Sequence, residues 1–174
     1  MATTSARHPS NPNAELSLSA DGRRRLRNQR EGSVPGYYND GRGSRGHCSY
    51  GIGILVHRGP CTADELRRPL SASQIEASFA AAVREAERAV RRNVTRQTLA
   101  QAQFDGLVSY VFNTGARGAR QTLQYVDRGQ FQNAAAVMTR NVYSIQSGRT
   151  VFMPGLVPRR RAESAPFQQN EGQR

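Results

Sequence analysis

The segment "TRQTLAQAQFDGLVSYVFNTG" (residues 95–115) is the most apolar part of the chain. Its large apolar side chains recur at the spacing of one helix face. They are Leu99, Phe104, Leu107, Val108, Val111 and Phe112. Asn113 and Gly115 follow the last of them, and both residue types are common where helices end. The segment therefore predicts a central helix that ends near residue 115.

Further helical patterns lie on both sides of this segment. In 71–94, "SASQIEASFAAAVREAERAVRRNV", Ser73 and Glu76 predict a capping box, and apolar residues follow at helical spacing with arginines on the other face. Two shorter helices are predicted within 120–140. The stretch 154–164, "PGLVPRRRAES", predicts a last helix in which prolines precede the arginines.

The N-terminal third of the chain has a different composition. Residues 18–32 predict a first helix with Ser19 as its N-cap, Leu26 facing the core and Gly32 at the C-terminal end. Residues 33–61 combine Gly and Pro with tyrosines and a short β-type run, and they predict two or three short antiparallel strands. This order of elements predicts an α+β fold that is predominantly helical, without an internal repeat.

The length of 174 residues suits one domain with a buried core. Both ends are polar and lack apolar periodicity, so we expect a flexible lead over 1–15, a packed domain over 16–163 and a polar tail over 164–174. No run approaches the roughly 18 apolar residues of a membrane helix. The N-terminus also lacks the apolar region of a cleavable signal, and we expect a monomer without a transmembrane segment.

The charge balance is strongly basic. The formal net charge is +12, and all 25 basic residues are arginine. An excess of this size predicts a polyanionic partner such as nucleic acid, an anionic membrane surface or an acidic cell-wall polymer. The arginines are spread over most segments and no nucleic-acid-binding motif occurs, so no specific nucleic acid is expected.

The two cysteines, Cys48 and Cys61, lie 13 residues apart in a glycine-rich region. They are either two buried reduced thiols or a disulfide across a hairpin, and the polar surroundings favour the disulfide. A disulfide indicates an oxidising compartment such as the periplasm. The pair lacks CxxC spacing and has only His47 and His57 nearby, so we expect no metal site and no cofactor.

Two carboxyl groups lie between the first predicted helix and the predicted sheet. Glu31 lies at the end of the first predicted helix, and Asp40 follows nine residues later among glycines. Cleavage of an acetal needs a carboxylic acid that protonates the leaving oxygen and a carboxylate that activates water or attacks the anomeric carbon. Glu31 suits the role of general acid because it lies at the end of a helix against the core, where desolvation favours the protonated carboxyl group. Asp40, among glycines, suits the role of base. The spacing alone is a weak signal.

Several motifs place this pair in a longer pattern. Glu31–Gly32 is followed by Tyr38-x-Asp40 and then by "SYGIG" at 49–53. Downstream come three more segments, which are "FDGLVSYVFNTG" (104–115), "TLQYVDRGQFQNAAAVM" (122–138) and "GLVPRRRAE" (155–163). In this order they resemble the phage-type lysozymes, glycoside hydrolase family twenty-four, over roughly residues 18–163.

The resemblance implies a lysozyme-like fold with a small sheet lobe, a helical lobe and an active-site cleft between them. It implies a muramidase that cleaves the β-1,4 bond between N-acetylmuramic acid and N-acetylglucosamine with inversion. Glu31 would be the general acid and Asp40 the base for water. Ser49 stands where the family has a threonine that helps to place that water, and a serine keeps the hydroxyl group.

The resemblance also implies supporting residues. In the family an arginine of the last helix neighbours the catalytic glutamate, and both Arg159 and Arg160 match that motif. Glycan contacts are expected from Tyr38, Gly51 and Asn113, although each also has a structural explanation as core, strand geometry or helix cap.

The sequence departs from the family between Asp40 and Gly51. The inserted "RGSRGHC" (42–48) lengthens this loop and carries Cys48, so a bridge between Cys48 and Cys61 would pin it. The usual "GxGH" becomes "GIGILVH", which leaves open whether His57 replaces the family's histidine. The chain has no tryptophan, although the family often has one after the penultimate helix.

The sequence is consistent with two classes of function. The first is a peptidoglycan hydrolase, which would be either an endolysin that passes through a holin or an interbacterial toxin injected into the periplasm. A toxin would also have an immunity protein as partner. The second is a non-catalytic arginine-rich protein that binds nucleic acid or an anionic envelope polymer. The missing signal indicates delivery by a holin or a secretion apparatus, or a piece of a longer chain.

Overall fold

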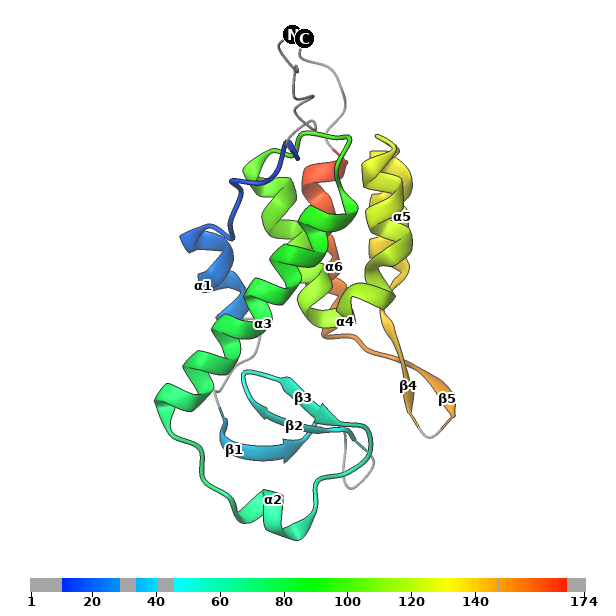
Figure 1. Cartoon of the computed structure of the whole chain (residues 1–174). Helices are drawn as coiled ribbons and strands as arrows, with labels where there is room; N and C mark the ends of the chain where they lie inside the picture. Colours follow the sequence, from blue (N-terminus) through cyan, green and yellow to red (C-terminus); the bar gives the residue numbers. More distant parts are fainter. Residues whose placement is uncertain (1–10, 29–33, 41–45, 147, 169–174) are drawn as a thin grey trace, which may run out of the picture.

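A helical lobe stands on a small β-sheet lobe (Figure 1). The computed structural model describes residues 11–28, 34–40, 46–146 and 148–168. In chain order the elements are α1 (Ala20–Asn28), β1 (Val34–Asn39), β2 (Cys48–Gly51), β3 (Ile54–His57), α2 (Ala63–Arg67), α3 (Ala72–Asn93), α4 (Gln101–Asp127), α5 (Phe131–Arg140), β4 (Tyr143–Gln146), β5 (Arg149–Phe152), α6 (Leu156–Ser164) and the 3-10 turn η2 (Ala165–Phe167). The expected helix-dominated α+β fold is confirmed.

Helix α4 forms the centre of the helical lobe and packs against α3, α5 and α6. Phe104, Leu107 and Val108 on this helix are fully buried, as their spacing predicted. Gly115 interrupts the helix with φ +72 and ψ 162. The chain then resumes as a second helical stretch to Asp127. The predicted break near residue 115 is therefore confirmed, because glycine adopts this left-handed φ without steric strain.

Helix α3 begins two residues before the predicted capping box. The Ser71 side chain accepts the N–H of Gln74, and the Gln74 side chain accepts the N–H of Ser71. The box predicted from Ser73 and Glu76 is therefore wrong. Both registers have the Ser-x-x-Glu/Gln pattern and leave the same apolar face inward, so the sequence pattern did not distinguish them. Glu76 instead forms an ion pair with Arg27 of α1.

The sheet lobe contains three antiparallel strands in the order β1–β2–β3, which confirms the predicted sheet. Tyr38 pairs with Ser49 and Asn39 with Cys48 along the first ladder. Gly51 at the end of β2 has φ +56, and a Cβ there would lie 2.8 Å from a side-chain carbon of Ile75. This glycine thus permits the sheet to approach α3 closely.

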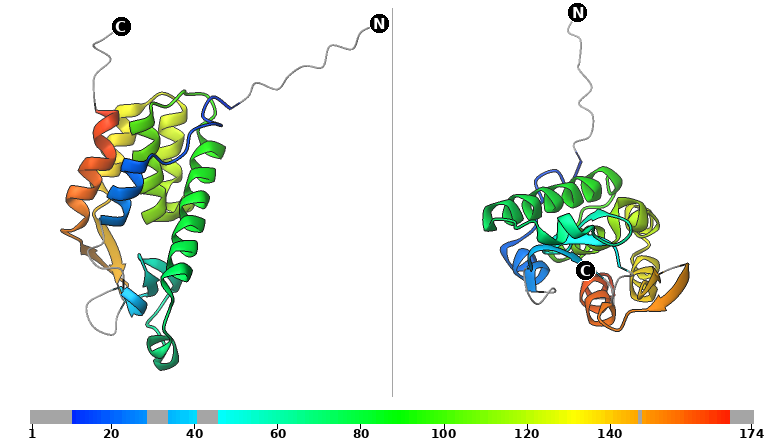
Figure 2. Two further views of the ribbon diagram at one scale, coloured as in Figure 1. Left: turned by 90° about the vertical axis from the view of Figure 1, so that its left-hand side faces the viewer. Right: turned by 90° about the horizontal axis from the view of Figure 1, so that it is seen from below.

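The structure also contains elements that we did not predict. Helix α2 follows the sheet, and strands β4 and β5 form an antiparallel hairpin that projects from the helical lobe on the side of the sheet (Figures 1 and 2). Gly148 lies in the turn of this hairpin with φ +74. Residues of this hairpin line the cleft between the two lobes.

Residues at both expected tails belong to the core. Asn13 is fully buried, where its side chain donates to the carbonyl oxygens of Val94 and Gln97 and accepts the N–H of Leu99. Phe167 in η2 is 1% exposed. The packed part of the chain therefore extends beyond 16–163 on both sides. No helix within the described residues is long and apolar enough to cross a membrane.

Helices α4 and α6 pack closely against each other at Gly106. A Cβ at Gly106 would lie 2.6 Å from the backbone oxygen of Glu163. We expect Gly106→Ala to force the helices apart and to lower the free energy of unfolding by about 1–3 kcal/mol. The midpoint of thermal unfolding should fall by roughly 2–12 °C, measured by circular dichroism.

Gly155→Ala is the matched control for this substitution. A Cβ at Gly155 meets nothing within 4 Å, and its φ of −63 suits alanine. This variant should unfold at the wild-type temperature. Equal midpoints for the two variants would contradict the close approach of α4 and α6.

Candidate active site

A cleft of about 600 Å³ separates the sheet lobe from the helical lobe. Asp40, Ser49 and Gly53 line it from the sheet lobe, and residues 112–114 line it from α4. The β4–β5 hairpin adds residues 143–145, and α6 adds Arg160. Residues from three distant parts of the sequence therefore share one concave surface, which is the usual setting of a substrate site.

Asp40 and Ser49 are hydrogen-bonded partners in this cleft. Ser49 Oγ donates to Asp40 Oδ2 at 3.1 Å, and the backbone N–H of His47 donates to Asp40 Oδ1 at 2.8 Å. Asp40 follows β1 and is exposed, whereas Ser49 on β2 is 1% exposed. One hydroxyl and one amide thus hold the carboxylate in a fixed orientation. The structure brings together these two of the three predicted catalytic residues.

The third predicted catalytic residue, Glu31, lies outside the described residues. Most of the inserted "RGSRGHC" does as well, since residues 42–45 are not described. The distance between the two proposed carboxyl groups therefore stays a prediction.

Arg159 and Arg160 are both buried, and they lie against different cavities. Arg160 lines the cleft that contains Asp40. Arg159 lines a neighbouring cavity of about 530 Å³. Asn113 and Leu156 line both cavities, so the two are adjacent. The two arginines therefore form part of the walls of two adjacent cavities.

Hydrogen bonds fix Arg160 from several sides. Its guanidinium donates to the Asn113 side chain and, at 2.8 Å, to the backbone oxygen of Asn141. It also lies over the ring of Tyr110, 4.9 Å from the centroid. Asn113, predicted as a cleft residue or a helix cap, therefore lies in the cleft wall and connects α4 to α6.

Glu163 is a residue that the sequence analysis missed. It is 2% exposed, and its carboxylate accepts Arg159 Nε at 2.8 Å and Arg160 Nη1 at 2.6 Å. Ser109 Oγ donates a third hydrogen bond at 2.6 Å. The spacings of three and four residues within one helix were the available signal. Glu163 positions both arginines of the predicted motif.

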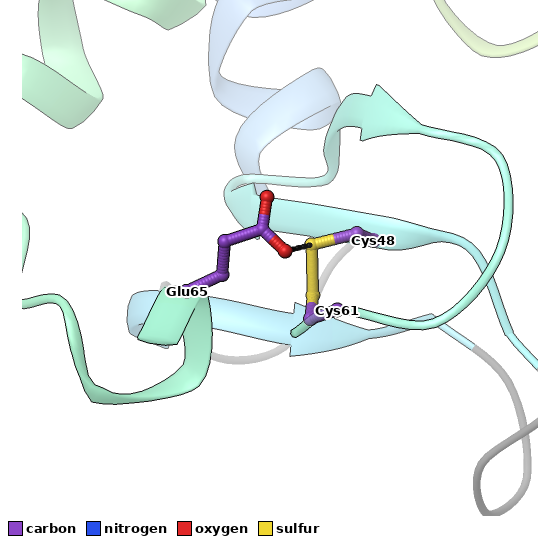
Figure 3. A group of neighbouring side chains, drawn as sticks. All are labelled: Cys48, Cys61 and Glu65. Atoms are coloured by element: carbon purple, nitrogen blue, oxygen red, sulfur yellow. Dashed lines mark hydrogen bonds between the residues drawn. A yellow bond between two sulfur atoms is a disulfide. The ribbon is translucent and has the colours of Figure 1, made fainter. Parts of the chain in front are cut away.

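The disulfide between Cys48 and Cys61 forms, as the sequence favoured, with a Cα–Cα distance of 4.6 Å (Figure 3). Cys48 precedes Ser49 directly. The backbone N–H of Cys61 donates to Asn39 Oδ1 at 2.7 Å, and Asn39 precedes Asp40. The bridge therefore ties together the backbone neighbours of both cleft residues.

Glu65 lies beside the disulfide, with a carboxylate oxygen 3.9 Å from Cys48 Sγ (Figure 3). Both sulfur atoms are bonded to each other. They offer no thiolate ligand, so this group does not fit a metal ion.

His57 pairs with Glu65, with Nε2 3.2 Å from the carboxylate. The pKa of His57 is raised above its usual value, first by the hydrogen bond with the carbonyl oxygen of Arg58 and then by Glu65. The pKa of Glu65 is lowered, first by the N–H of Thr62 and then by His57. His57 is not among the residues that line the two cavities, so its contacts assign it to the support of α2.

Two other predicted glycan contacts lie away from the cleft lining. Tyr38 is half-buried on β1 and is not among the lining residues of either cavity. Gly51 is turned toward α3, as described above, whereas Gly53 lines the cleft.

Fold and cleft together define a two-lobed protein of the lysozyme type. Residues 28–163 match the family model described as Phage lysozyme, and the chain belongs to that family. No curated protein matches this sequence.

Solved structures of several other proteins share this fold. An endolysin from Escherichia coli O157:H7 phage FAHEc1 is 24% identical, covers 88% of this chain and 94% of its own, and has a TM-score of 0.69. The muramidase domain of SpmX from Asticaccaulis excentricus is 24% identical, with coverages of 89% and 99% and a TM-score of 0.66. The active form of the P1 phage endolysin Lyz is 20% identical, with coverages of 89% and 86% and a TM-score of 0.66.

The buried position of Glu163 allows a stability test. Glu163→Gln keeps the shape of the side chain but removes the charge that faces two buried guanidinium groups. We expect a loss of about 3–5 kcal/mol in the free energy of unfolding, because breaking a buried ion pair leaves charge uncompensated. Urea unfolding measures this loss.

Glu85→Gln supplies the control for this test. Glu85 also contacts two arginines, Arg88 and Arg92, but its side chain is 57% exposed. Its substitution should leave the urea midpoint almost unchanged. A Glu163 variant as stable as the Glu85 variant would show that the buried carboxylate of Glu163 does not stabilise the fold.

Proposed function

We propose that this protein is a muramidase, a peptidoglycan hydrolase that cleaves the β-1,4 bond between N-acetylmuramic acid and N-acetylglucosamine. The observation that carries this proposal is the Asp40–Ser49 pair, which faces a cleft between the two lobes of a phage-lysozyme fold. Structures with the same fold are described as endolysins and as a muramidase domain, which agrees with the proposal.

Asp40 acts as the general base in this proposal. It takes a proton from a water molecule as the water oxygen attacks the anomeric carbon of N-acetylmuramic acid. Each Asp40 oxygen already accepts one hydrogen bond, from His47 or from Ser49, and a carboxylate oxygen has a further lone pair for water. Ser49 lies close enough to help hold that water. Preorientation of this kind removes much of the entropic part of the barrier.

Glu31 acts as the general acid and gives its proton to the leaving oxygen of N-acetylglucosamine. The water attacks from the face opposite to the leaving group, so the product has inverted configuration at the anomeric carbon. This mechanism predicts carboxyl groups roughly 6.5–9.5 Å apart. Arg159 and Arg160 lie on α6 beside the cleft. We propose that they stabilise the charge and the position of Glu31.

The proposed site of action is the bacterial cell wall, reached in an oxidising compartment such as the periplasm. The Cys48–Cys61 bridge supports this location, because disulfides persist mainly in oxidising compartments. Delivery through a holin as an endolysin and injection as an interbacterial toxin both remain compatible with it. A neighbouring holin gene would favour the endolysin, and a gene for a small periplasmic inhibitor would favour the toxin.

The catalytic assignment is tested by removing each carboxylic function. Glu31→Gln and Asp40→Asn should each reduce the clearance of purified cell walls by at least about 100-fold, because general acid–base groups contribute that much or more. Turbidity measures the rate, and circular dichroism confirms that the variants fold.

Asp64→Asn is the control for this experiment. Asp64 lies on α2 with a side chain that is 85% exposed, and it pairs only with Arg67 among the described contacts. This variant should clear walls at the wild-type rate. A wild-type protein that clears no walls but binds DNA in a salt-sensitive way would instead support the non-catalytic reading of the +12 charge.

The disulfide predicts that activity depends on the redox state. Reduction should release Cys61 from β2 and loosen the strand ends that hold Asp40 and Ser49. Because small displacements of a reacting group can slow a reaction about 100-fold, we expect wall clearance to fall by roughly 10-fold or more in reductant and to recover on reoxidation.

A double variant, Cys48→Ser with Cys61→Ser, provides the control. It should have the lowered rate under all conditions and should not respond to reductant. Thermal unfolding identifies a temperature at which the reduced protein is still folded. Equal rates with and without the bridge at that temperature would show that the bridge does not position the cleft residues.

A further inference from the structure

Most of the exposed large apolar side chains lie on β3 or on the β4–β5 hairpin, and three of them line the cleft. Six such side chains occur among the described residues, and five of them lie on β3 or on the β4–β5 hairpin. These five are Leu55, Val56, Tyr143, Ile145 and Phe152. The sixth, Leu66, lies on α2. Exposed apolar side chains that cluster in this way mark a binding surface more often than scattered ones do.

Tyr143 and Ile145 place this apolar surface on the cleft wall. They are two residues apart on β4 and therefore project from the same face of the strand. Both line the cleft although they are 54% and 63% exposed. Leu55 on β3 lines the same cleft and is 54% exposed. The sheet lobe and the hairpin thus each contribute an apolar side chain to the same cleft.

Phe152 supports the ring of Tyr143. The two residues are direct partners in the β4–β5 ladder, and their ring centroids lie 5.6 Å apart. The tilted contact restricts the Tyr143 ring without burying it. A restrained, half-exposed aromatic ring loses little conformational entropy when a flat ligand stacks on it.

We propose that the β4–β5 hairpin is a glycan-binding wall in which Tyr143 and Ile145 hold a sugar ring of the peptidoglycan strand beyond the cleaved bond. This inference rests on the proposed function. A pyranose ring has apolar C–H faces and polar edges. The cleft offers the matching pattern, with apolar side chains from two hairpins and polar groups from Asp40, Asn113 and Arg160.

A lipid surface fits this arrangement less well. Tyr143 and Ile145 line a concave space that also contains the Asp40 carboxylate, and a bilayer surface neither enters such a space nor favours a carboxylate there. The apolar residues are also continuous with the Asp40–Ser49 pair, so a strand bound at that pair passes along the hairpin.

The experiment compares kcat and KM on soluble, uncrosslinked peptidoglycan strands. Tyr143→Ala and Ile145→Ala should each raise KM by about 5- to 50-fold, in line with the loss of one buried apolar contact, and should leave kcat within about twofold. Contacts made equally in the ground and transition states act on KM in this way. Tyr143→Phe should keep the wild-type KM, because stacking needs the ring and not the hydroxyl.

Leu66→Ala is the matched control, since Leu66 is equally apolar and 49% exposed but lies on α2 outside the cleft lining. It should leave KM unchanged. If the wild type is active and the hairpin variants have the KM of the Leu66 variant, the inference is overturned while the proposed function stands.

A binding measurement separates the inference from catalysis. In an Asp40→Asn background, cosedimentation with purified cell walls should fall at least fivefold with Tyr143→Ala and not with Leu66→Ala. This result is expected even if the wild type cleaves nothing, in which case only the proposed function fails. Loss of binding to anionic phospholipid vesicles with unchanged binding to walls would assign the hairpin to a lipid surface and overturn the proposal.

Discussion

The buried carboxylate of Glu163 is the interaction on which the helical half of the cleft depends. It accepts hydrogen bonds from the two guanidinium groups of its own helix, Arg159 and Arg160, and from the hydroxyl group of Ser109 on α4. Arg159 also donates to the backbone oxygen of Ser109, so the contacts with Ser109 bind α6 to α4. Arg160 then extends the network to Asn113 and Asn141. Such a network is stable only when every buried polar group has a partner, because isolated buried charge is strongly unfavourable. The cleft wall is consequently rigid, since moving one guanidinium would break several bonds.

The sheet half of the cleft is held by different means. Helix α2 has no buried residue, and two of the four side chains of β3 are exposed. A small sheet with so little buried surface is only marginally stable by itself. The disulfide supplies the missing constraint, and it does so beside Ser49 and, through Asn39, beside Asp40. A covalent bridge in the lobe with the weaker core thus holds the residues whose positions matter most.

The sequence predicted features that depend on local pattern. The apolar stripe of α4, its break at Gly115 and the small antiparallel sheet follow from periodicity and from residues with special backbone freedom. The start of α3 was misplaced because two overlapping capping patterns share one apolar face. The burial of Asn13 was not predictable, since its partners lie more than 80 residues away. In the β4–β5 hairpin only β4 (YSIQ) alternates apolar and polar residues, whereas β5 (RTVF) does not, and both strands are too short to stand out.

The net charge of +12 has no single location, because the arginines serve different purposes. Arg159 and Arg160 hold the fold from inside, while Arg67 and Arg88 form exposed pairs within their own helices. What remains is a diffuse positive field. At physiological salt it is screened within about 8 Å, so it acts on a polyanion that is already near. Attraction of this kind stabilises the ground state and the transition state equally and therefore retains the protein on its substrate without accelerating the bond cleavage. Selection of the bond then depends on the cleft, where the charges are few and their orientations are fixed.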